Sequence, residues 1–336
     1  MKKKYLFMVF VVTLLLNVSL MLNPAEVSAK TYRLNLSSVW TLSYHFLVDP
    51  VLDFAKKVEE RTHGDVKITV YPAGQLFKGA QEFPALERGE LDMSALNDVY
   101  ITGIIPELGV ISLPFQWADN ESFQRSLSAG LLDLGIKEKF KEHNAILLSA
   151  ASGGGYQIYS KEQQVTSPKD FEGKIWGVSG STASKTCEAL GGSPTTMSSG
   201  ELYLALQRGT IDGTTRPLIT GSGRKLHEVV KNLNIANMYY YTSMLLINKE
   251  VWDDLPKEYQ DIMQQAAYER DAMQLKMLKE YEAGVVEEFT SKGIDVHIPS
   301  QAEREALKEK VGPVYDWWYG MVDNGKKYTD FIAQHH

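Results

Sequence analysis

Cysteine is nearly absent from this chain, in which Cys187 is the only one among 336 residues. A lone cysteine cannot form an internal disulfide, so the fold must be held together by packing alone. A single cysteine is more often a small buried apolar side chain than a nucleophile, and we interpret Cys187 in that way. We therefore expect neither a disulfide framework nor thiol chemistry.

A long basic segment is also missing, and 42 Asp and Glu outnumber 35 Lys and Arg, for a formal net charge of −7. We therefore expect no nucleic-acid partner. The seven histidines are scattered, and no HExxH, CxxC or carboxylate cluster occurs, so we expect no metal ion and no cofactor. Ser179 lies in GVSG, which lacks the second glycine of a nucleophile elbow. These absences favour a binding protein over an enzyme.

The N-terminus has one largely apolar run, over residues 5–22, and lysines at positions 2–4 precede it. Val27-Ser28-Ala29 then places small residues where a signal peptidase reads them. We predict a signal peptide over residues 1–29, cleavage after Ala29 and an exported protein; the alternative is an uncleaved membrane anchor. No cysteine lies near the cleavage site, so a lipid anchor is not supported.

What the chain does contain is a repeat. Residues Ala85–Ser94 read ALERGELDMS, and residues Ala205–Thr214 read ALQRGTIDGT. Each copy is typical of a helix that ends at glycine and is followed by a short strand, which begins at the next apolar residue and ends in the aspartate. With 336 residues and 44% hydrophobic content, the chain is long enough for two ordinary domains. The repeat therefore predicts two similar α/β lobes.

The apolar pattern predicts alternating strands and helices around both copies of the repeat. Ser152 to Gly155 contains three glycines without a GK[ST] or GxGxxG pattern, which favours a flexible connector between lobes over a phosphate site. Pro256 to Lys292 reads as one long helix that spans both lobes, with Trp317-Trp318 as packing anchors after it. The other expected elements cover Tyr32–Val39, Phe46–Arg61, Val66–Val70, Asn120–Leu134, Ala145–Ala150, Ser181–Leu190 and Tyr239–Ile247.

Over essentially the whole segment after residue 29, the sequence resembles the DctP-type substrate-binding proteins of TRAP transporters, the tripartite ATP-independent periplasmic transporters. The most specific part is the order Glu-x-Tyr-x-Ala-Leu-Gln-x-Gly-x-x-Asp-Gly that begins at Glu201. The matching segments are Phe54–Leu76, Leu86–Met93, Leu113–Phe115, Asp170–Val178 and Ala189–Pro217.

The resemblance implies an α/β fold of the periplasmic-binding-protein kind, in which two lobes close around a ligand in the cleft between them and a long C-terminal helix spans both. It implies a small organic acid as ligand and delivery to the small and large membrane subunits of a TRAP permease. We expect a monomer. We assign residues 30–152 and about 240–280 to lobe I, and residues 153–239 and about 281–336 to lobe II.

The sequence departs from the family where an arginine normally holds the ligand carboxylate. The matching position is Trp176 or Gly177, depending on the placement of a one-residue gap, and neither is arginine. A second ligand position, an asparagine in the family, is Arg216 here, and the family glutamate before it is Thr215. Ligands of α/β lobes lie beyond the carboxyl ends of the strands, where the repeat places both Asn97 and Arg216. We hypothesise that Arg216 has become the anion clamp; the alternative is a surface arginine paired with an acid.

Aromatic residues at other family positions suggest an apolar or aromatic acid, with Trp176 on the pocket floor and Phe115 nearby, although aromatic side chains also form ordinary cores. His45 follows the first strand and is a weaker candidate. The expected ligand-binding residues are Arg216, Asn97, Trp176, Tyr156, Trp40, Tyr100, Ser38, Val39, Ser199 and Thr215.

Three other functions stay open at this point. The missing family arginine allows a neutral solute as ligand. The same scaffold could serve a membrane sensor instead of a permease. A periplasmic enzyme is the alternative that the residues favour least, because the positions placed at the cleft are mainly aromatic, small or amide side chains.

Overall fold

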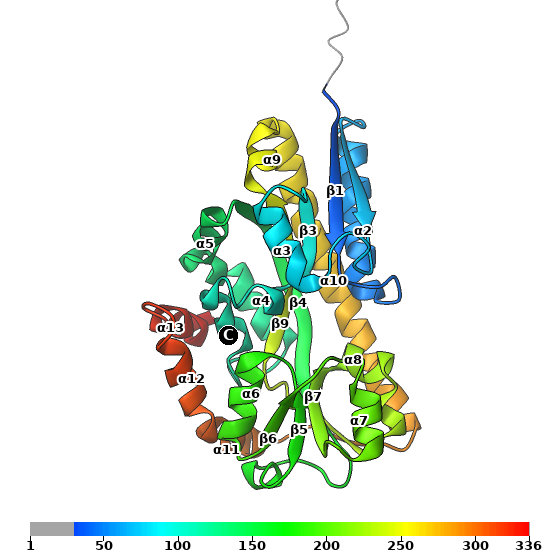
Figure 1. Cartoon of the computed structure of the whole chain (residues 1–336), viewed down its shortest axis with the longest axis vertical. Helices are drawn as coiled ribbons and strands as arrows, with labels where there is room; N and C mark the ends of the chain where they lie inside the picture. The colour runs from blue at the N-terminus through cyan, green and yellow to red at the C-terminus, as the bar shows by residue number, and fades with distance from the viewer. Residues whose placement is uncertain (1–29, 336) are drawn as a thin grey trace, which may run out of the picture.

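A computed structural model describes residues 30–335 of the chain (Figure 1). The predicted signal peptide and its cleavage site lie outside the described residues. The described strands follow the order β2-β1-β3-β9-β4-β7-β5-β6, with β8 beside β4 and β10 beside β8. Figure 1 shows this sheet divided between an upper and a lower lobe, with helices against both parts. The predicted two-lobe α/β fold is confirmed.

The upper lobe, lobe I, is built on three parallel strands and one antiparallel strand. In order across the sheet these are β2 (Val66–Tyr71), β1 (Tyr32–Ser38), β3 (Met93–Asn97) and β9 (Tyr240–Asn248). Two helices of this lobe are α2 (His45–Arg61), which packs on β2, and α3 (Gly79–Glu87), which packs on β3. The buried face of α2 carries Phe46, Leu47, Val51, Phe54 and Val58, the three- and four-residue spacing expected of an amphipathic helix.

The lower lobe, lobe II, repeats this arrangement with a different set of strands. In order across the sheet these are β6 (Ser193–Thr196), β5 (Ile175–Val178), β7 (Gly213–Pro217) and β4 (Ala145–Ser160). As in lobe I, the first three are parallel and the fourth is antiparallel. The remaining elements of this lobe are α6 (Gly180–Ala189), α7 (Leu202–Arg208), α8 (Leu218–Gly223), β8 (Asn232–Asn234) and β10 (Asp295–His297).

The long strand β4 joins the two lobes. Its residues from Ala145 to Gly155 pair with β9, and those from Tyr156 onward pair with β7. The three glycines lie within this strand, so the expected flexible connector is wrong. A side chain at Gly153 would overlap the ring of Tyr241, and Gly154 has a φ of 111° beside a register shift, so close packing and a bulge explain the glycines.

The predicted long helix is α10 (Lys257–Ser291), which runs from the upper to the lower lobe in Figure 1. Its first part contributes Met263 and Leu278 to the lobe I core, and its last part contributes Val285 and Phe289 to the lobe II core. One helix therefore carries side chains of both cores. The other helices are α4 (Asn120–Ser128), α5 (Ile136–Glu142), α9 (Lys249–Asp254), α11 (Gln301–Lys310), α12 (Gly312–Tyr319) and α13 (Lys326–His335).

The helices after α10 connect the lower lobe back to the upper one. Helix α12 packs on α6, whereas α13 packs on α4 and on the short helix η3 (Leu131–Leu134). Trp318 is buried and its indole nitrogen donates to the carbonyl of Pro106. The lobe boundaries proposed from sequence stay a prediction, but α13 contacts elements from the first predicted lobe segment.

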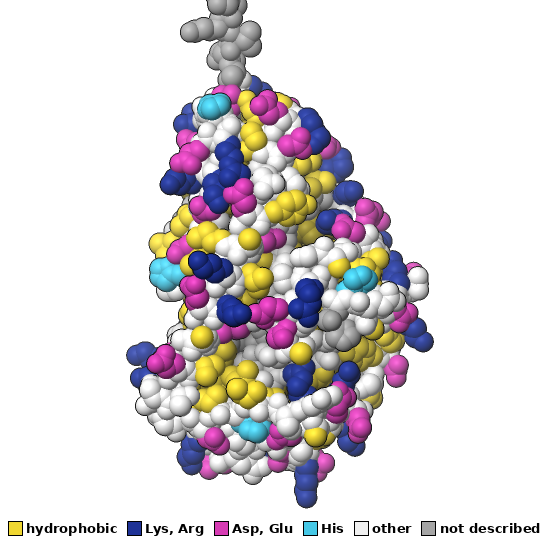
Figure 2. All heavy atoms as spheres, turned by 180° about the vertical axis from the view of Figure 1, so that it is seen from behind, with side chains coloured by type: hydrophobic (Ala, Val, Ile, Leu, Met, Phe, Trp, Pro, Cys, Tyr) yellow, Lys and Arg dark blue, Asp and Glu magenta, His cyan; other side chains and the backbone are white. Residues whose placement is uncertain are grey.

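The surface gives two further observations. Figure 2 shows acidic and basic side chains interspersed over the back of the molecule, without a broad area of one sign. Within residues 30–335, none of the helices has both the length and the apolar character that crossing a bilayer requires.

Candidate functional site

The two copies of the repeat form equivalent turns at the ends of α3 and α7. Gly89 and Gly209 follow these helices with φ angles of 72° and 70°, which favour glycine. In the first copy the Glu90 amide donates to the carbonyl of Ala85 over 2.9 Å. In the second copy the Thr210 amide donates to the carbonyl of Ala205 over 3.0 Å.

The aspartates of the two copies also have the same role. A carboxylate oxygen of Asp92 accepts from the Asn35 amide on β1 over 2.8 Å, and one of Asp212 accepts from the Ile175 amide on β5 over 2.8 Å. Each aspartate therefore connects the strand after it to the parallel strand beside it. As a result, the carboxyl ends of β3 and β7 lie at equivalent edges of the two lobes. The strands begin after the aspartates, at Met93 and Gly213, so the prediction that they end in the aspartates is wrong.

Arg216 lies at this edge of lobe II and is only 3% exposed. Its terminal nitrogens donate to the carbonyls of Thr215 (2.8 Å) and Gly177 (3.4 Å), and to those of Val178 (3.1 Å) and Met197 (2.9 Å). Val178 ends β5 and Met197 follows β6. The guanidinium thus reaches across the carboxyl ends of the parallel strands, which is where α/β lobes bind ligands.

The charge of Arg216 has no acidic partner among residues 30–335, since all its contacts are to neutral carbonyls. The expected alternative, a surface arginine paired with an acid, is therefore wrong. Burial lowers the pKa of Arg216, whereas Tyr156 and Tyr239 act in the opposite direction. A buried cation without an anion is costly, so this position favours an anionic ligand.

Tyrosine rings lie beside Arg216 at the junction of the lobes. The ring of Tyr156 on β4 is 4.6 Å from that of Tyr239 and 6.0 Å from that of Tyr241 on β9. The Tyr239 hydroxyl is 2.7 Å from the hydroxyl oxygen of Thr215, the residue before Arg216. All three rings come from the two strands that connect the lobes or from the residue that precedes β9. The structure therefore places Tyr156, Thr215 and Arg216 next to one another, and their role in ligand binding stays a prediction.

Lobe I contributes a second group of predicted residues. The indole nitrogen of Trp40 donates to the side-chain oxygen of Asn97 over 3.0 Å, which fixes the orientation of the amide. Ser38 is buried beneath them, and its hydroxyl oxygen accepts from the Trp40 amide over 3.3 Å. Trp40 itself is buried and packs in the lobe I core. Asn97, Trp40 and Ser38 therefore form one contiguous group at the carboxyl ends of β1 and β3.

The remaining predicted residues occupy more peripheral positions. Tyr100 is 41% exposed and its ring packs over Gly79, while Val39 is half-buried against the lobe I core. The Ser199 hydroxyl accepts from Arg224 over 3.4 Å at the surface of lobe II. His45 is exposed and pairs with Asp49, one turn further along α2. Within residues 30–335, none of these four residues forms a hydrogen bond or ion pair with Arg216.

Trp176 is not on a pocket floor. Its side chain is fully buried in the core, where its ring centroid is 4.5 Å from that of Phe171. A side chain at Gly192 or Gly213 would overlap the Trp176 ring, so the indole fills the space that these glycines leave. Phe115 is likewise buried in the core. Trp176 therefore stabilises lobe II instead of contacting a ligand, and its prediction as a site residue is corrected.

Sequence reasoning missed two features of the junction. Tyr239 and Tyr241 fall in a run that reads only as a buried strand, although three consecutive tyrosines were a visible signal. Asp98, directly after Asn97, is fully buried, and burial raises its pKa to about 7. A charged residue at the end of an apolar strand was the available signal for Asp98.

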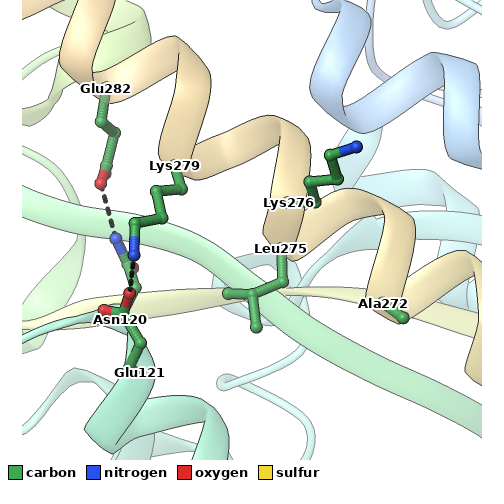
Figure 3. A pocket seen from close by; sticks show the side chains of 7 residues that line it. All are labelled: Asn120, Glu121, Ala272, Leu275, Lys276, Lys279 and Glu282. Atoms are coloured by element: carbon green, nitrogen blue, oxygen red, sulfur yellow. Dashed lines mark hydrogen bonds and ion pairs between the residues drawn. The ribbon is translucent and has the colours of Figure 1, made fainter.

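Two surface cavities lie along α10, away from Arg216. One, of about 400 Å³, opens between α4 and α10, with Lys279 directed at Glu121 and Glu282 directed at Asn120 (Figure 3). Burial raises the pKa of Glu282 to about 7. The other, of about 300 Å³, is lined partly by Gln124 and Asp271. Neither cavity contains a residue predicted from the sequence to bind the ligand.

The chain resembles known proteins over most of its length. Residues 37–320 match the family described as bacterial extracellular solute-binding protein, family 7, or DctP. The C4-dicarboxylate-binding periplasmic protein DctP of Rhodobacter capsulatus is 29% identical over 266 residues, which cover 78% of this chain and 79% of that protein. The sialic acid-binding periplasmic protein SiaP of Vibrio cholerae is 29% identical over 262 residues, covering 78% and 80%.

Solved structures show the same fold. A TRAP periplasmic solute-binding protein of Ochrobactrum anthropi has a TM-score of 0.86 and 22% identity, covering 91% of this chain and 96% of that one. A TRAP periplasmic solute-binding protein of Chromohalobacter salexigens with bound D-glucuronate has a TM-score of 0.82 and 22% identity, covering 91% and 100%.

Proposed function

The chain belongs to the DctP family, the bacterial extracellular solute-binding proteins of family 7, and from this premise we propose that it captures a small organic anion at Arg216. Its relatives include proteins named for C4-dicarboxylate and for sialic acid, both of which are carboxylates. The observation that carries the proposal is the buried, uncompensated guanidinium across the ends of β5 and β6.

The energetics of Arg216 support an anion over a neutral solute. The carbonyls around the guanidinium satisfy its hydrogen bonds but leave its positive charge in a low-dielectric region. A carboxylate that binds there gains a charge-assisted interaction, which is stronger than a hydrogen bond between neutral groups. The tyrosines beside it supply flat apolar surface for the rest of the ligand.

Capture would proceed by closing of the two lobes. A ligand shifts a conformational equilibrium only by its different affinity for the two states, so it must contact both lobes in the closed state. Arg216 belongs to lobe II, and the group of Asn97 and Trp40 belongs to lobe I. Ligand-dependent compaction in small-angle X-ray scattering is the expected result, and unchanged scattering with a tightly bound ligand would contradict closure.

The rest of the assignment follows from the family. We propose that the mature protein is a periplasmic monomer, released from residues 1–29 by signal peptidase, and that it passes its ligand to the small and large subunits of a TRAP permease. It has no catalytic role in this proposal. Two permease genes beside its own gene would support transport, whereas a neighbouring histidine kinase gene would favour a sensory role.

The test of the anion clamp is the pair Arg216→Gln and Arg208→Gln, in which Arg208 is an exposed control on the same lobe. A panel of small carboxylates is first screened by thermal shift, because a ligand that binds only the folded state raises the melting temperature. For the hits, calorimetry should show a loss of affinity on the order of 100-fold for Arg216→Gln and little change for Arg208→Gln. Equal affinities for wild type and Arg216→Gln would remove the clamp.

A further inference from the structure

Asp98 is a buried carboxyl group to which the proposed function assigns no role. One carboxyl oxygen, Oδ1, accepts from the backbone amide of Thr242 over 2.7 Å. The other oxygen, Oδ2, is buried and has no hydrogen-bond partner among the described residues. The Thr242 hydroxyl lowers the pKa of Asp98 but makes no well-formed hydrogen bond to it. Buried polar atoms are nearly always paired, so a free acceptor at this place needs an explanation.

Asp98 in lobe I, like Arg216 in lobe II, lies at the carboxyl end of the strand that follows the repeat, although the residue equivalent to Arg216 is Leu96. Asn97 is the last residue of β3 and pairs with Ser243 on β9. Asp98 comes next, at the carboxyl end of β3, and its side chain binds the amide of Thr242 on β9, the neighbour of Ser243. Each lobe therefore carries a buried ionisable side chain at the carboxyl edge of its sheet.

A continuous set of tyrosine contacts connects the two groups. Tyr241, next to Thr242, has its ring 6.0 Å from that of Tyr156, which is 4.6 Å from that of Tyr239. The hydroxyl of Tyr239 contacts Thr215, the neighbour of Arg216. Among the described residues, Asp98 and Arg216 form no ion pair with each other. The acid and the cation therefore lie at opposite ends of a cluster of aromatic rings.

The electrostatics agree with this arrangement. Burial raises the pKa of Tyr156 most, Arg216 lowers it and Asp98 raises it, so both charges act on the same hydroxyl. Burial also raises the pKa of Asp98 itself. A nearby donor that binds the carboxylate form would act in the opposite direction. Within the described protein, the groups that do so are the Thr242 amide, the Thr242 hydroxyl and the local backbone amides.

We propose that the solute carries a hydrogen-bond donor, either a hydroxyl or an ammonium group, which the free Oδ2 of Asp98 accepts while Arg216 holds the carboxylate. The ligand class is then the hydroxy and amino carboxylic acids, with the tyrosine cluster against the carbon skeleton. This inference rests on the proposed function, because it takes the carboxylate of the ligand to lie at Arg216. A ligand that bridges the two groups contacts both lobes, as closure requires.

The first experiment uses wild-type protein and pairs of acids that differ only in the donor. Suitable pairs are malate with succinate and phenyllactate with phenylpropanoate, and phenylalanine extends the second pair to an ammonium donor. Calorimetry should show that the donor-bearing member of the pairs that bind has about 10- to 100-fold higher affinity, because a site built to bind a donor rejects the analogue that leaves its acceptor unpaired.

The second experiment uses Asp98→Asn. Asparagine keeps an oxygen for the Thr242 amide and replaces the free oxygen by an NH₂ group, which cannot accept a hydrogen bond. The preference within each pair should then disappear, whereas Arg216→Gln should weaken both members. Asp133→Asn, at a largely exposed aspartate, is the matched control and should keep the preference.

Each outcome has one meaning. Equal affinities within the pairs, or a preference that survives Asp98→Asn, overturn the role of Asp98 and leave the organic-anion function intact. Failure of every acid in the full panel to bind overturns the proposed function itself. The wild-type comparison needs no substitution, so it decides the proposal even if Asp98→Asn does not fold.

Discussion

The two lobes share a backbone plan but differ in the polarity of equivalent positions. Strands β2-β1-β3-β9 of lobe I correspond to β6-β5-β7-β4 of lobe II. In lobe I the carboxylate of Glu82 accepts from Ser37 (2.8 Å) and Ser94 (2.7 Å) in the core. The corresponding residues of lobe II are Leu202, Gly177 and Thr214, and a side chain at Gly177 would contact Leu202.

The polarity is reversed at the carboxyl ends of the repeat strands. Leu96 in β3 is fully buried in an apolar core, whereas its equivalent in β7 is Arg216. The glycine turns and the aspartate hydrogen bonds between strands are the same in both copies of the repeat, so they account for the shared backbone. The residues with different polarity distinguish the two lobes, since the acid Glu82 is buried in lobe I and the cation Arg216 is buried at a strand end of lobe II.

The largest effects are expected when the two equivalent strand-end residues are replaced, one of which should change stability and the other ligand affinity. Leu96→Ala should lower the free energy of unfolding by about 2–5 kcal/mol, because it removes buried apolar volume. Arg216→Gln should lower ligand affinity on the order of 100-fold. Chemical denaturation and calorimetry on both variants check these expectations. If Leu96→Ala weakens binding as much as Arg216→Gln does, the division between a structural strand end and a binding strand end is wrong.

A second test concerns Glu82, the carboxylate in the core of lobe I. Glu82→Ala should destabilise the protein by about 2–4 kcal/mol, since it leaves a cavity and removes the partner of two buried hydroxyls. Leu202→Ala in lobe II should cost a comparable amount through the cavity alone. Adding Ser37→Ala and Ser94→Ala should recover part of the loss only in the Glu82→Ala background. Recovery of the same size in the Leu202→Ala background would contradict the hydrogen-bond explanation.

The third test uses pH. Burial raises the pKa of Glu82 from 4.5 to about 7, although Ser94 and Ser37 partly oppose this. Between these pH values the folded protein holds a proton that the unfolded chain releases, so the contribution of Glu82 to stability is lost as pH rises through this range. Glu82→Gln does not titrate, so its stability relative to wild type should improve from pH 5 to pH 8.

Denaturation of wild type and Glu82→Gln at several pH values measures this difference. Asp98 and Glu282, whose pKa values burial also raises to about 7, are present in both proteins and cancel in the comparison. A difference that is constant with pH would mean that Glu82 does not bind a proton on folding.

The smallest expected effects concern the shared turns. Gly89→Ala and Gly209→Ala should each lower stability by about 1 kcal/mol, because both positions have positive φ angles. Gly312, at the start of α12, has open space around it and no positive φ, so Gly312→Ala is a suitable control. Losses that differ greatly between Gly89→Ala and Gly209→Ala would show that the two turns are not equivalent.

Sequence predicted the elements whose signals are local. The expected helix over Phe46–Arg61 is confirmed as His45–Arg61, and that over Pro256 to Lys292 as Lys257–Ser291, because their apolar residues recur at helical spacing. The strand conformation of the three glycines of β4 could not be predicted from a local pattern, because glycine has no side chain to show a periodicity. This part of the strand depends instead on its pairing with β9.

The sequence placed candidate residues correctly where their position depends on strand ends, and misplaced them where it depends on side-chain direction. The repeat located Arg216 correctly at a carboxyl end. Trp176 was misplaced because the family resemblance gives a position along the chain but not the face toward which the side chain points. This face is decided by the space beside Gly192 and Gly213. Asp98 was missed because its hydrogen-bond partner, the amide of Thr242, lies 144 positions away in the sequence.

The order of strands also has a consequence for how the chain folds during its synthesis. Strand β9 lies between β3 and β4, yet it comes after every strand of lobe II except β10. Lobe I therefore cannot complete its sheet until residues 240–248 have left the ribosome, and these late long-range pairings favour slow folding. A chain that cannot finish its first lobe early stays unfolded longer, which is the state that a protein needs if it is to be threaded across a membrane before it folds.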